Sequence, residues 1–336
     1  MDSPYGPLDF ALLNNWQRDF PITVRPFEHL GAAVGDGETA ILGALERLRA
    51  RGAISRVGAV FAARRVGAST LAALAAPAER LEDIAARISA RPEVNHNYQR
   101  EHHYNLWFVA TASDQARLAA ALGAIERETG CAVLSLPLEQ EYHIDLGFDL
   151  KSAHKHHARI PDTPVREPDA IEQRLIAALQ PGLELVSRPF ARLGERAGMS
   201  ESEVLTRIAG WIGEGMIKRF GVVVRHQELG YRANAMVVFD APDRDVDRIG
   251  RQLATEAAVT LCYRRTRNLP HWPYNLYCMV HGRSREEVGP VIERLSRQAG
   301  LPGLTLFSTR RFKQCGARYF AESAVPDLAA AGFANA

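Results

Sequence analysis

The chain contains an internal repeat, and this repeat limits its fold more than any other feature of the sequence. Residues 25–61 align without a gap to residues 188–224, with 13 identities in 37 positions. A Tyr-Asn-Leu triplet at 104–106 recurs at 274–276, where the offset has grown from 163 to 170. Five of the extra residues fall just before the second triplet. The chain is therefore a tandem duplication of a unit large enough to fold as one or two small domains.

The first part of each copy predicts three helices followed by a strand. Apolar residues at positions 8, 12, 13 and 16 have the spacing of one helix face, and positions 171, 175, 176 and 179 repeat it. A short second helix follows around 188–198. A third helix is expected to begin after Ser200, which suits an N-cap, and to end at Gly215. With a strand over 217–224, this order is that of a winged helix-turn-helix.

The second part of each copy alternates strands and helices. In the first copy we expect strands near 68–76, 94–101, 104–112 and 132–138, and helices near 79–90 and 114–129. The order strand-helix-strand-strand-helix-strand is ferredoxin-like. The predicted fold class is thus α+β, a tandem duplication of a winged helix-turn-helix and a ferredoxin-like domain. The predicted parts are 1–66 and 67–150 for the first copy, a linker at 151–168, 169–229 and 230–320 for the second copy, and a tail at 321–336.

The composition excludes several protein classes. The chain is 46% hydrophobic and 24% charged, as globular proteins are. It has no run of eighteen apolar residues and no basic segment leading into an apolar core, so neither a membrane span nor a secretory signal is expected. Four cysteines without a CxxC pair predict no disulfide framework, no metal site and a cytoplasmic location. The linker histidines His154, His156 and His157 are expected to be solvated.

Two stretches resemble a known family. AGMSESEVLTRIAGWIGEGMIKRFGVVV (197–224) is similar to the recognition helix and wing of AsnC/leucine-responsive (AsnC/Lrp-like) regulators. VNHNYQREHHYNLWF (94–108) and CYRRTRNLPHWPYNLYCMVHG (262–282) resemble segments of the siroheme decarboxylases, which are AsnC-like enzymes of d1-type heme biosynthesis and of the alternative heme pathway. The resemblance covers nearly the whole chain. Two such subunits usually pair, and this chain resembles both of them fused.

The resemblance implies a carboxy-lyase that converts siroheme to 12,18-didecarboxysiroheme by removing two acetate carboxylates as CO2. Because the macrocycle itself can spread the developing charge, no separate cofactor is required, and iron enters as part of the substrate. The two copies are expected to form an internal pseudo-dimer. Whether further copies or related decarboxylase subunits join it is left open, and neither a membrane nor DNA is an expected partner.

The first hairpin segment carries the expected catalytic residues. His96, Tyr98, Arg100 and His102 are spaced by two, so on a strand they would share one face. We expect His96 and His102 to be proton donors, because imidazole titrates near neutral pH. Arg100 suits a carboxylate anchor. The remaining candidates for substrate binding in this segment are Tyr98, His103, Tyr104 and Asn105, of which Tyr104 and Asn105 suit a structural role at the turn equally well.

The second hairpin segment differs from the first at a key position. Leu261 stands where the first copy has His96, which predicts one productive pocket led by the first hairpin. The five extra residues predict a longer loop that covers the substrate, and His271 in it also suits an acid or an iron ligand. Trp107 is expected in the core. The candidates for substrate binding in the second hairpin are Arg264, Arg265, Arg267, His271, Trp272 and Tyr274.

The alternative interpretation is an AsnC/Lrp-like transcriptional regulator that senses a heme-type ligand. A helix-turn-helix normally indicates duplex DNA. Here, however, the third helices carry acidic residues, with Glu38 and Glu46 in the first copy and Glu201 and Glu203 in the second. These would face phosphates unfavourably. Arg192, Arg196 and Arg207 keep the regulator interpretation open, whereas winged helices that only hold the two copies together would need no DNA.

Overall fold

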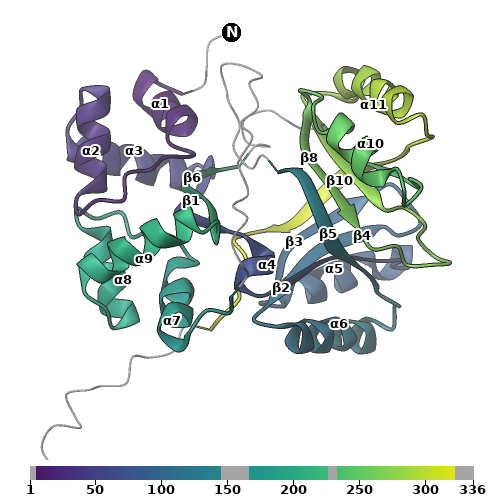
Figure 1. Cartoon of the computed structure of the whole chain (residues 1–336), viewed down its shortest axis with the longest axis horizontal. Helices are drawn as coiled ribbons and strands as arrows, with labels where there is room; N and C mark the ends of the chain where they lie inside the picture. Colours follow the sequence, from purple (N-terminus) through teal and green to yellow (C-terminus); the bar gives the residue numbers. More distant parts are fainter. Residues whose placement is uncertain (1–4, 145–165, 226–232, 322–336) are drawn as a thin grey trace, which may run out of the picture.

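The computed structural model describes residues 5–144, 166–225 and 233–321, arranged as a helical layer beside a β-barrel (Figure 1). The predicted linker histidines lie outside the described residues. The helices of the described residues are too short or too polar to span a membrane.

The helical layer contains the helix-turn-helix units of both copies. Two capping boxes fix helix starts in the second copy, because Asp169 and Ser200 each accept a hydrogen bond from the backbone three residues on. Ser200 is thus the N-cap that the sequence predicts. Gly215, with φ 73°, lies just past the end of this helix as expected. The elements are α1 (Pro7–Asn15), α2 (Pro26–Val34), α3 (Glu38–Ala50) and β1 (Ile54–Phe61), then α7 (Ala170–Leu179), α8 (Pro189–Ala197), α9 (Glu201–Gly213) and β6 (Ile217–Val224).

The wing strands of the two copies pair with each other. β1 and β6 form a two-stranded antiparallel sheet in which Gly58 lies opposite Gly221, its equivalent in the repeat. One continuous apolar core fills the space between this sheet and the helices of both copies. The winged-helix units are therefore a single pseudo-symmetric body, in agreement with an internal pseudo-dimer.

The ferredoxin-like halves form a closed eight-stranded barrel in the order β10-β3-β4-β2-β5-β8-β9-β7. The long strands β5 and β10 each pair with strands of both copies and so close the barrel. The strands of the first copy are β2 (Ala68–Leu74), β3 (Val94–Arg100), β4 (Leu106–Ala112) and β5 (Leu134–Ile144), and those of the second are β7 (Ala233–Phe239), β8 (Val259–Arg265), β9 (Leu276–Gly282) and β10 (Leu304–Gln314).

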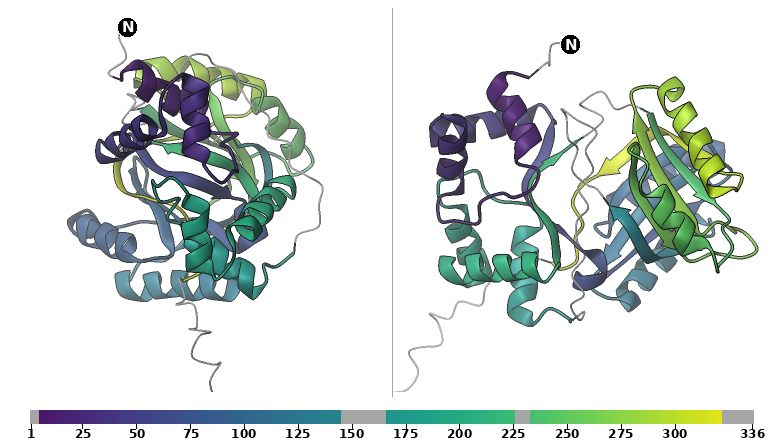
Figure 2. Two further views of the ribbon diagram at one scale, coloured as in Figure 1. Left: turned by 90° about the vertical axis from the view of Figure 1, so that its left-hand side faces the viewer. Right: turned by 45° about the horizontal axis from the view of Figure 1, so that its top comes forward.

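Helices cover the outside of the barrel, so that each strand has a helix-facing side and a barrel-facing side (Figures 1 and 2). The barrel-facing side of both copies forms a separate apolar cluster that includes Trp107, Tyr263, Trp272 and Tyr277. Trp107 is in the core, as predicted. The remaining helices are α4 (Ala63–Val66), the 3-10 turn η1 (Ala78–Arg80), α5 (Leu81–Ala90), α6 (Gln115–Thr129), α10 (Val246–Leu253) and α11 (Arg285–Ala299).

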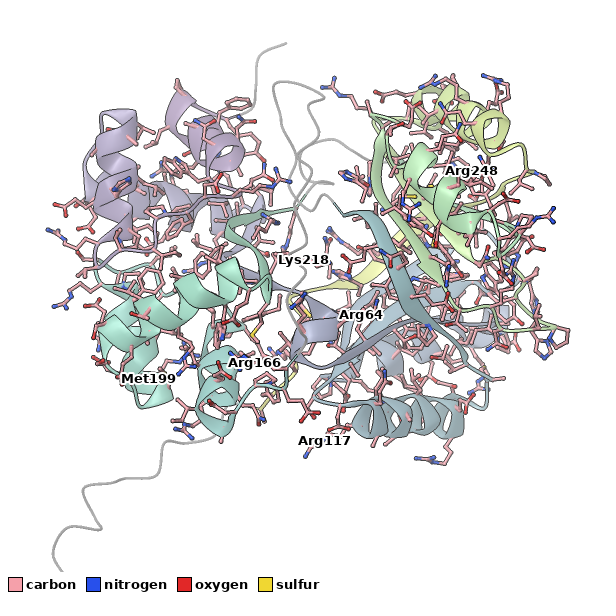
Figure 3. All side chains as sticks on the ribbon, viewed as in Figure 1. Arg64, Arg117, Arg166, Met199, Lys218 and Arg248 are labelled. Carbon is pink, nitrogen blue, oxygen red and sulfur yellow. The ribbon has the colours of Figure 1, made fainter. Side chains whose placement is uncertain are left out.

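Two basic residues join the helical layer to the barrel. Figure 3 shows Lys218 and Arg64 at the boundary between the two layers. The Lys218 ammonium lies 2.5 Å from a carboxylate oxygen of Glu141, and Arg64 Nη1 donates to the Glu139 carbonyl at 2.7 Å. Both partners are on β5, so this strand contacts the helical layer as well as both halves of the barrel.

Candidate functional site

Three of the four predicted residues of the first hairpin share the barrel-facing side of β3. The rings of His96 and Tyr98 lie 6.2 Å apart, and the Arg100 guanidinium lies 5.9 Å from the Tyr98 ring centroid. Asn97, between them, points the other way and donates to the Ala85 carbonyl on α5. The alternation of a strand thus builds an imidazole, a phenol and a guanidinium into one surface.

The second copy completes this surface. Arg100 lies near Tyr263 on β8 and His281 on β9, close enough to influence the charge state of His281. His281 lies within 2.9 Å of the Thr260 hydroxyl and 3.1 Å of the Asn234 amide nitrogen. The polar interior is therefore assembled from side chains of both copies, and neither copy alone contains it.

Burial governs the protonation of this interior. It lowers the pKa of His96 to about 4, helped by the nearby Arg56 charge, and that of His281 to about 4, helped by Arg100. Burial also lowers the pKa of Arg100 to about 10 and raises that of the Tyr98 hydroxyl. Among the described residues no carboxylate pairs with Arg100, which is 6% exposed and donates to the Leu306 carbonyl at 2.9 Å. An anion with several carboxylates would supply the missing charge.

His102 is not on the strand as predicted, because β3 ends at Arg100 and His102 lies in the turn that follows. Its Nδ1 accepts the Tyr104 backbone N–H at 3.0 Å, which requires an unprotonated Nδ1. The ring stacks with Tyr104, with centroids 5.9 Å apart, and meets Trp272 edge-on at 5.5 Å. Burial and the neighbouring His103 lower its pKa. His103 itself is exposed.

Of the three predicted anchors in the second hairpin, only Arg265 faces the barrel interior. Its guanidinium lies 4.6 Å from the Tyr263 ring centroid, and its Nη1 donates to the Leu136 carbonyl at 2.8 Å. Arg264 pairs instead with Glu139 and Asp247, and Arg267 pairs with Asp240 and Asp243. Arg264 and Arg267 thus each pair with carboxylates of the protein. The sequence pattern did not reveal these ion pairs.

The loop of the longer second hairpin packs Trp272 into the barrel-facing apolar cluster and leaves His271 at the surface. Trp272 is 1% exposed and packs against Trp107 with ring centroids 5.1 Å apart. Tyr104 and Tyr274 contact it edge-on at 6.0 and 4.9 Å. His271, next to Trp272, is exposed. The loop therefore forms an aromatic plug that joins the two copies.

The two asparagines of the Tyr-Asn-Leu triplets are structural. Asn105 accepts from the Ala76 N–H at 2.9 Å and donates to the Ala76 carbonyl at 2.8 Å. Asn275 makes the same pair of bonds to Ala241, both at 3.0 Å. Because each amide bonds to a loop backbone, these contacts support the structural role considered for Asn105, and substrate binding by Asn105 stays a prediction.

Three residues near the site were missed in the sequence. Arg56 on β1 lies close enough to His96 to lower its pKa, and Arg219 is its equivalent on β6. The repeat contained this signal, because both arginines belong to the 13 identities and interrupt apolar strands. His281 had no such signal, since its equivalent in the first copy is Thr111.

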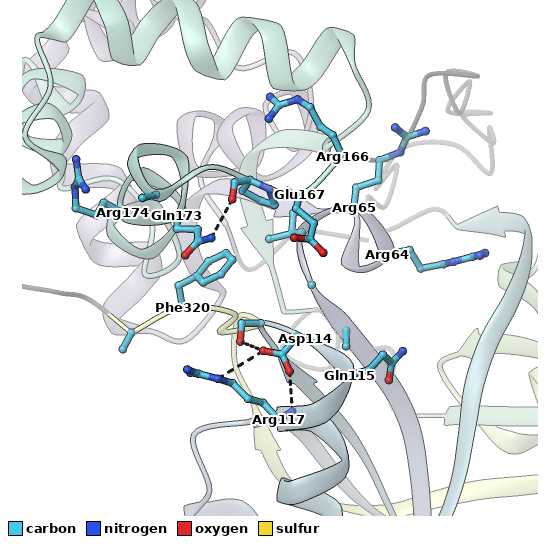
Figure 4. A pocket seen from close by; sticks show the side chains of 17 residues that line it. Arg64, Arg65, Asp114, Gln115, Arg117, Arg166, Glu167, Gln173, Arg174 and Phe320 are labelled. Atoms are coloured by element: carbon cyan, nitrogen blue, oxygen red, sulfur yellow. Dashed lines mark hydrogen bonds and ion pairs between the residues drawn. The ribbon is translucent and has the colours of Figure 1, made fainter.

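A cavity of about 950 Å³ lies elsewhere, between α4, α6 and α7 (Figure 4). Its lining is rich in arginine, but these side chains have protein partners. Arg117 pairs with Asp114, Arg166 with Glu172, and Arg174 donates to the Ala197 carbonyl. None of the predicted site residues lines it. The cavity is therefore separate from the residues that the sequence predicts for the site.

Comparisons with known proteins agree with the duplication. A model for siroheme decarboxylase NirDL-like HTH domains matches residues 9–54 and 172–217, and a model for AsnC-like ligand-binding domains matches residues 65–143 and 228–313. Both models thus match once in each copy.

Full-length and half-length relatives are also similar to this chain. The siroheme decarboxylase NirDL subunit of Paracoccus denitrificans (strain Pd 1222) is 45% identical over 92% of this chain and 96% of its own. The siroheme decarboxylase NirL subunit of Stutzerimonas stutzeri is 55% identical over 42% of this chain and 85% of its own. A crystal structure of the siroheme decarboxylase NirDL with an iron-uroporphyrin III analogue superposes with a TM-score of 0.69, at 28% identity over 94% of both chains.

Proposed function

This chain belongs to the siroheme decarboxylase family, and we propose that it acts as a carboxy-lyase that releases carboxylate groups of siroheme as CO2. The observation that carries this proposal is the barrel interior. There an imidazole, a phenol and buried guanidinium groups lie together without a carboxylate partner for Arg100. A substrate with carboxylates around an apolar macrocycle matches such a surface.

The reaction needs one proton for each carboxylate lost. The bond between the acetate methylene carbon and its carboxylate breaks, CO2 leaves, and the electron pair stays on the methylene carbon, where the conjugated ring spreads it. A proton then adds to that carbon and produces a methyl group. Because charge spreads into the macrocycle, we propose no separate cofactor, and iron arrives with the substrate.

We propose that His96 supplies this proton and that Arg100 and Arg265 hold other carboxylates. Burial lowers the pKa of His96 to about 4, so its imidazole is neutral near pH 7 in the protein alone. A substrate carboxylate beside it would raise the pKa, because an opposite charge favours the protonated ring. Substrate binding would thereby favour the protonated form of His96, which is the form that donates the proton. His102 stays a second predicted donor, although it lies beyond the end of β3.

The finer parts of the proposal concern the product and the partners. We propose loss of the two acetate carboxylates that gives 12,18-didecarboxysiroheme, in d1-type or alternative heme biosynthesis. One productive pocket, on the His96 side, would serve the pseudo-dimer. Additional copies or related decarboxylase subunits, and a cytoplasmic location, stay predictions.

Anaerobic incubation of the purified chain with siroheme, followed by mass spectrometry of the tetrapyrrole, tests the function. Loss of two CO2 masses is the expected result, and an incubation without the chain is the control. Loss of one CO2 mass would mean that a partner is missing. Siroheme that binds but keeps its mass would contradict the enzyme and favour the ligand-sensing regulator.

A further inference from the structure

The paired wing strands carry two arginines that the reaction has not yet used. Arg56 on β1 and Arg219 on β6 are equivalent in the repeat, and each lies two residues before the glycine at the centre of its strand. Their neighbours Val57 and Phe220 point into the helical core. Since side chains alternate along a strand, both arginines lie on the face turned away from that core.

Both side chains are held in place but lack a counter-charge. Arg219 is 8% exposed and its Nη1 donates to the carbonyls of Gln17 and Val222 at 2.6 and 3.3 Å. Arg56 Nη2 donates to the Ala59 carbonyl at 3.0 Å. The Nε of each is buried without a hydrogen-bond partner, and within the described residues neither arginine has an ion pair with a carboxylate. Among the described residues the positive charge of each arginine therefore lacks a carboxylate to balance it.

These two charges are close to one another, and Arg56 is close to His96. Burial, with Arg18 and Arg56 nearby, lowers the pKa of Arg219 to about 9. Arg56 lies beside Gly316, where an added Cβ would come within 2.9 Å of its Nη1, and Gln314, two residues earlier, pairs with His96. The Arg56 charge accordingly helps burial to lower the pKa of His96. Bringing like charges together and out of water costs free energy, which a bound anion would recover. The cluster borders the proposed proton donor on its winged-helix side.

Duplex DNA does not suit this cluster. A side chain as buried as Arg219 cannot reach the phosphates of a duplex without a change in the fold. At the starts of α3 and α9, where such a motif reads bases, Glu38 pairs with Arg25 and Glu201 pairs with Arg188. A small ligand with several carboxylates, which enters between the two layers, fits the burial and the charge better.

We propose that Arg56 and Arg219 bind carboxylate groups of the tetrapyrrole, so that the paired wing strands form one wall of the substrate site. This inference rests on the proposed function for the identity of the ligand. It gives the winged-helix units a role in substrate binding. Each arginine contributes one of two equivalent anchors, and these lie on the same side of the substrate as His96.

The test is an anaerobic titration of Arg56→Gln and Arg219→Gln with siroheme and with iron-uroporphyrin, followed by the change in tetrapyrrole absorbance. Loss of a charge-assisted hydrogen bond predicts about 10- to 100-fold weaker binding for each variant. Arg192→Gln is the matched control, because the Arg192 side chain is on the exposed face of α8 and pairs with Glu195. It should bind as the wild type does. Arg56→Lys and Arg219→Lys should recover part of the affinity, since they keep the charge.

A methyl-esterified iron-uroporphyrin separates anion binding from a structural role. The esters carry no charge, so the glutamine variants should bind them as weakly as the wild type does. Equal losses for the acid and the ester, together with a lower unfolding temperature, would mean that the arginines only hold the Gln17 loop and would overturn the inference. Unchanged siroheme affinity, or loss of DNA binding instead, would overturn it as well. Siroheme that binds through these arginines without losing CO2 would contradict only the decarboxylase.

Discussion

The two barrel hairpins are equivalent in the repeat, but they differ in the residues that they place in the barrel. Tyr98 and Arg100 correspond to Tyr263 and Arg265, and each arginine donates to a carbonyl on the long strand of the other copy, at Leu306 and Leu136. Contacts that shape the barrel are thus kept in both. His96, by contrast, aligns with Leu261 in the second copy, and the second hairpin alone has the loop that buries Trp272. The two copies thus keep the same framework contacts but differ at the position of His96 and in the loop that carries Trp272.

The sharpest way to break this comparison is to make the first copy like the second. We expect His96→Leu to lower the rate of CO2 loss by about 100-fold or more, as for loss of a positioned general acid. The rate is measured anaerobically by mass spectrometry of the tetrapyrrole, at siroheme concentrations that saturate the variant.

The reciprocal change, Leu261→His, is the matched control. Alone it should leave the rate unchanged, and combined with His96→Leu it should not rescue activity, because the proposal has a single productive pocket, on the His96 side. Full activity of His96→Leu would contradict the assignment, and rescue by Leu261→His would mean that the two pockets are equivalent.

The second comparison concerns closure. Trp272→Ala should lower the free energy of unfolding by about 3–5 kcal/mol, as other buried Trp truncations do, because its indole packs on Trp107 and donates to the Tyr277 hydroxyl. His271→Ala, next to it but exposed, should change stability little. Denaturant unfolding measures both. Equal stability of Trp272→Ala and the wild type would mean that the plug contributes no packing energy.

Local sequence patterns predicted the fold well. Apolar periodicity and the repeat gave the order of helices and strands, and β6 begins and ends where the strand over 217–224 was expected. The pairing of β1 with β6 and the closure of the barrel were not predicted. Which strand edges meet depends on how the two copies pack, and no residue pattern within one copy encodes that.

The site was only partly predictable for the same physical reason. Alternation correctly grouped His96 with Arg100, but it carried on past the end of β3 and so misplaced His102. Arg264 looked like an anchor until the fold brought Asp247 to it. His281 had no signal because it is a lone imidazole in an apolar strand with Thr111 as its equivalent, whereas Arg219 could have been found from its identity with Arg56.

A third comparison sets the two helical units against each other. Glu172 and Asp9 are equivalent in the repeat, but Glu172 accepts two hydrogen bonds from Arg166, at 2.5 and 2.7 Å, and one each from Arg207 and Trp211. Asp9 has a single bond from Arg47 at 3.3 Å. Glu172→Gln should therefore lower the free energy of unfolding by about 3 kcal/mol, as when a buried pair is broken. Asp9→Asn should cost about 1 kcal/mol or less.

The pH dependence of this difference has a definite sign. The Arg166 hydrogen bonds lower the pKa of Glu172 to about 2, below the roughly 4.3 of an unfolded glutamate. Its contribution is therefore complete above the unfolded pKa and is lost as the pH falls toward 2. The gap between wild type and Glu172→Gln should narrow over that window. A gap that stays constant to pH 2 would show that shape, and not charge, makes the residue important.

The smallest expected effect returns to His96. In the folded chain its pKa is about 4, whereas an unfolded histidine titrates near 6.5. Between these values the unfolded chain takes up a proton that the folded chain does not, so the wild type loses stability as the pH falls from about 6.5 to 4. His96→Leu removes one such proton and should have a shallower dependence of unfolding free energy on pH, by at most about 1.4 kcal/mol per pH unit.

His281→Thr, which introduces the residue of the first copy, is the matched comparison, because burial also lowers the pKa of His281 to about 4. It should remove a similar slope. If the slopes of both variants equal that of the wild type, the two imidazoles are not held neutral by the barrel. In that case the proposal that bound siroheme raises the pKa of His96 and so protonates it has no physical basis, even if His96 is required for activity. The dependence of the unfolding free energy on pH thus tests whether His96 and His281 are neutral in the folded chain, separately from catalysis.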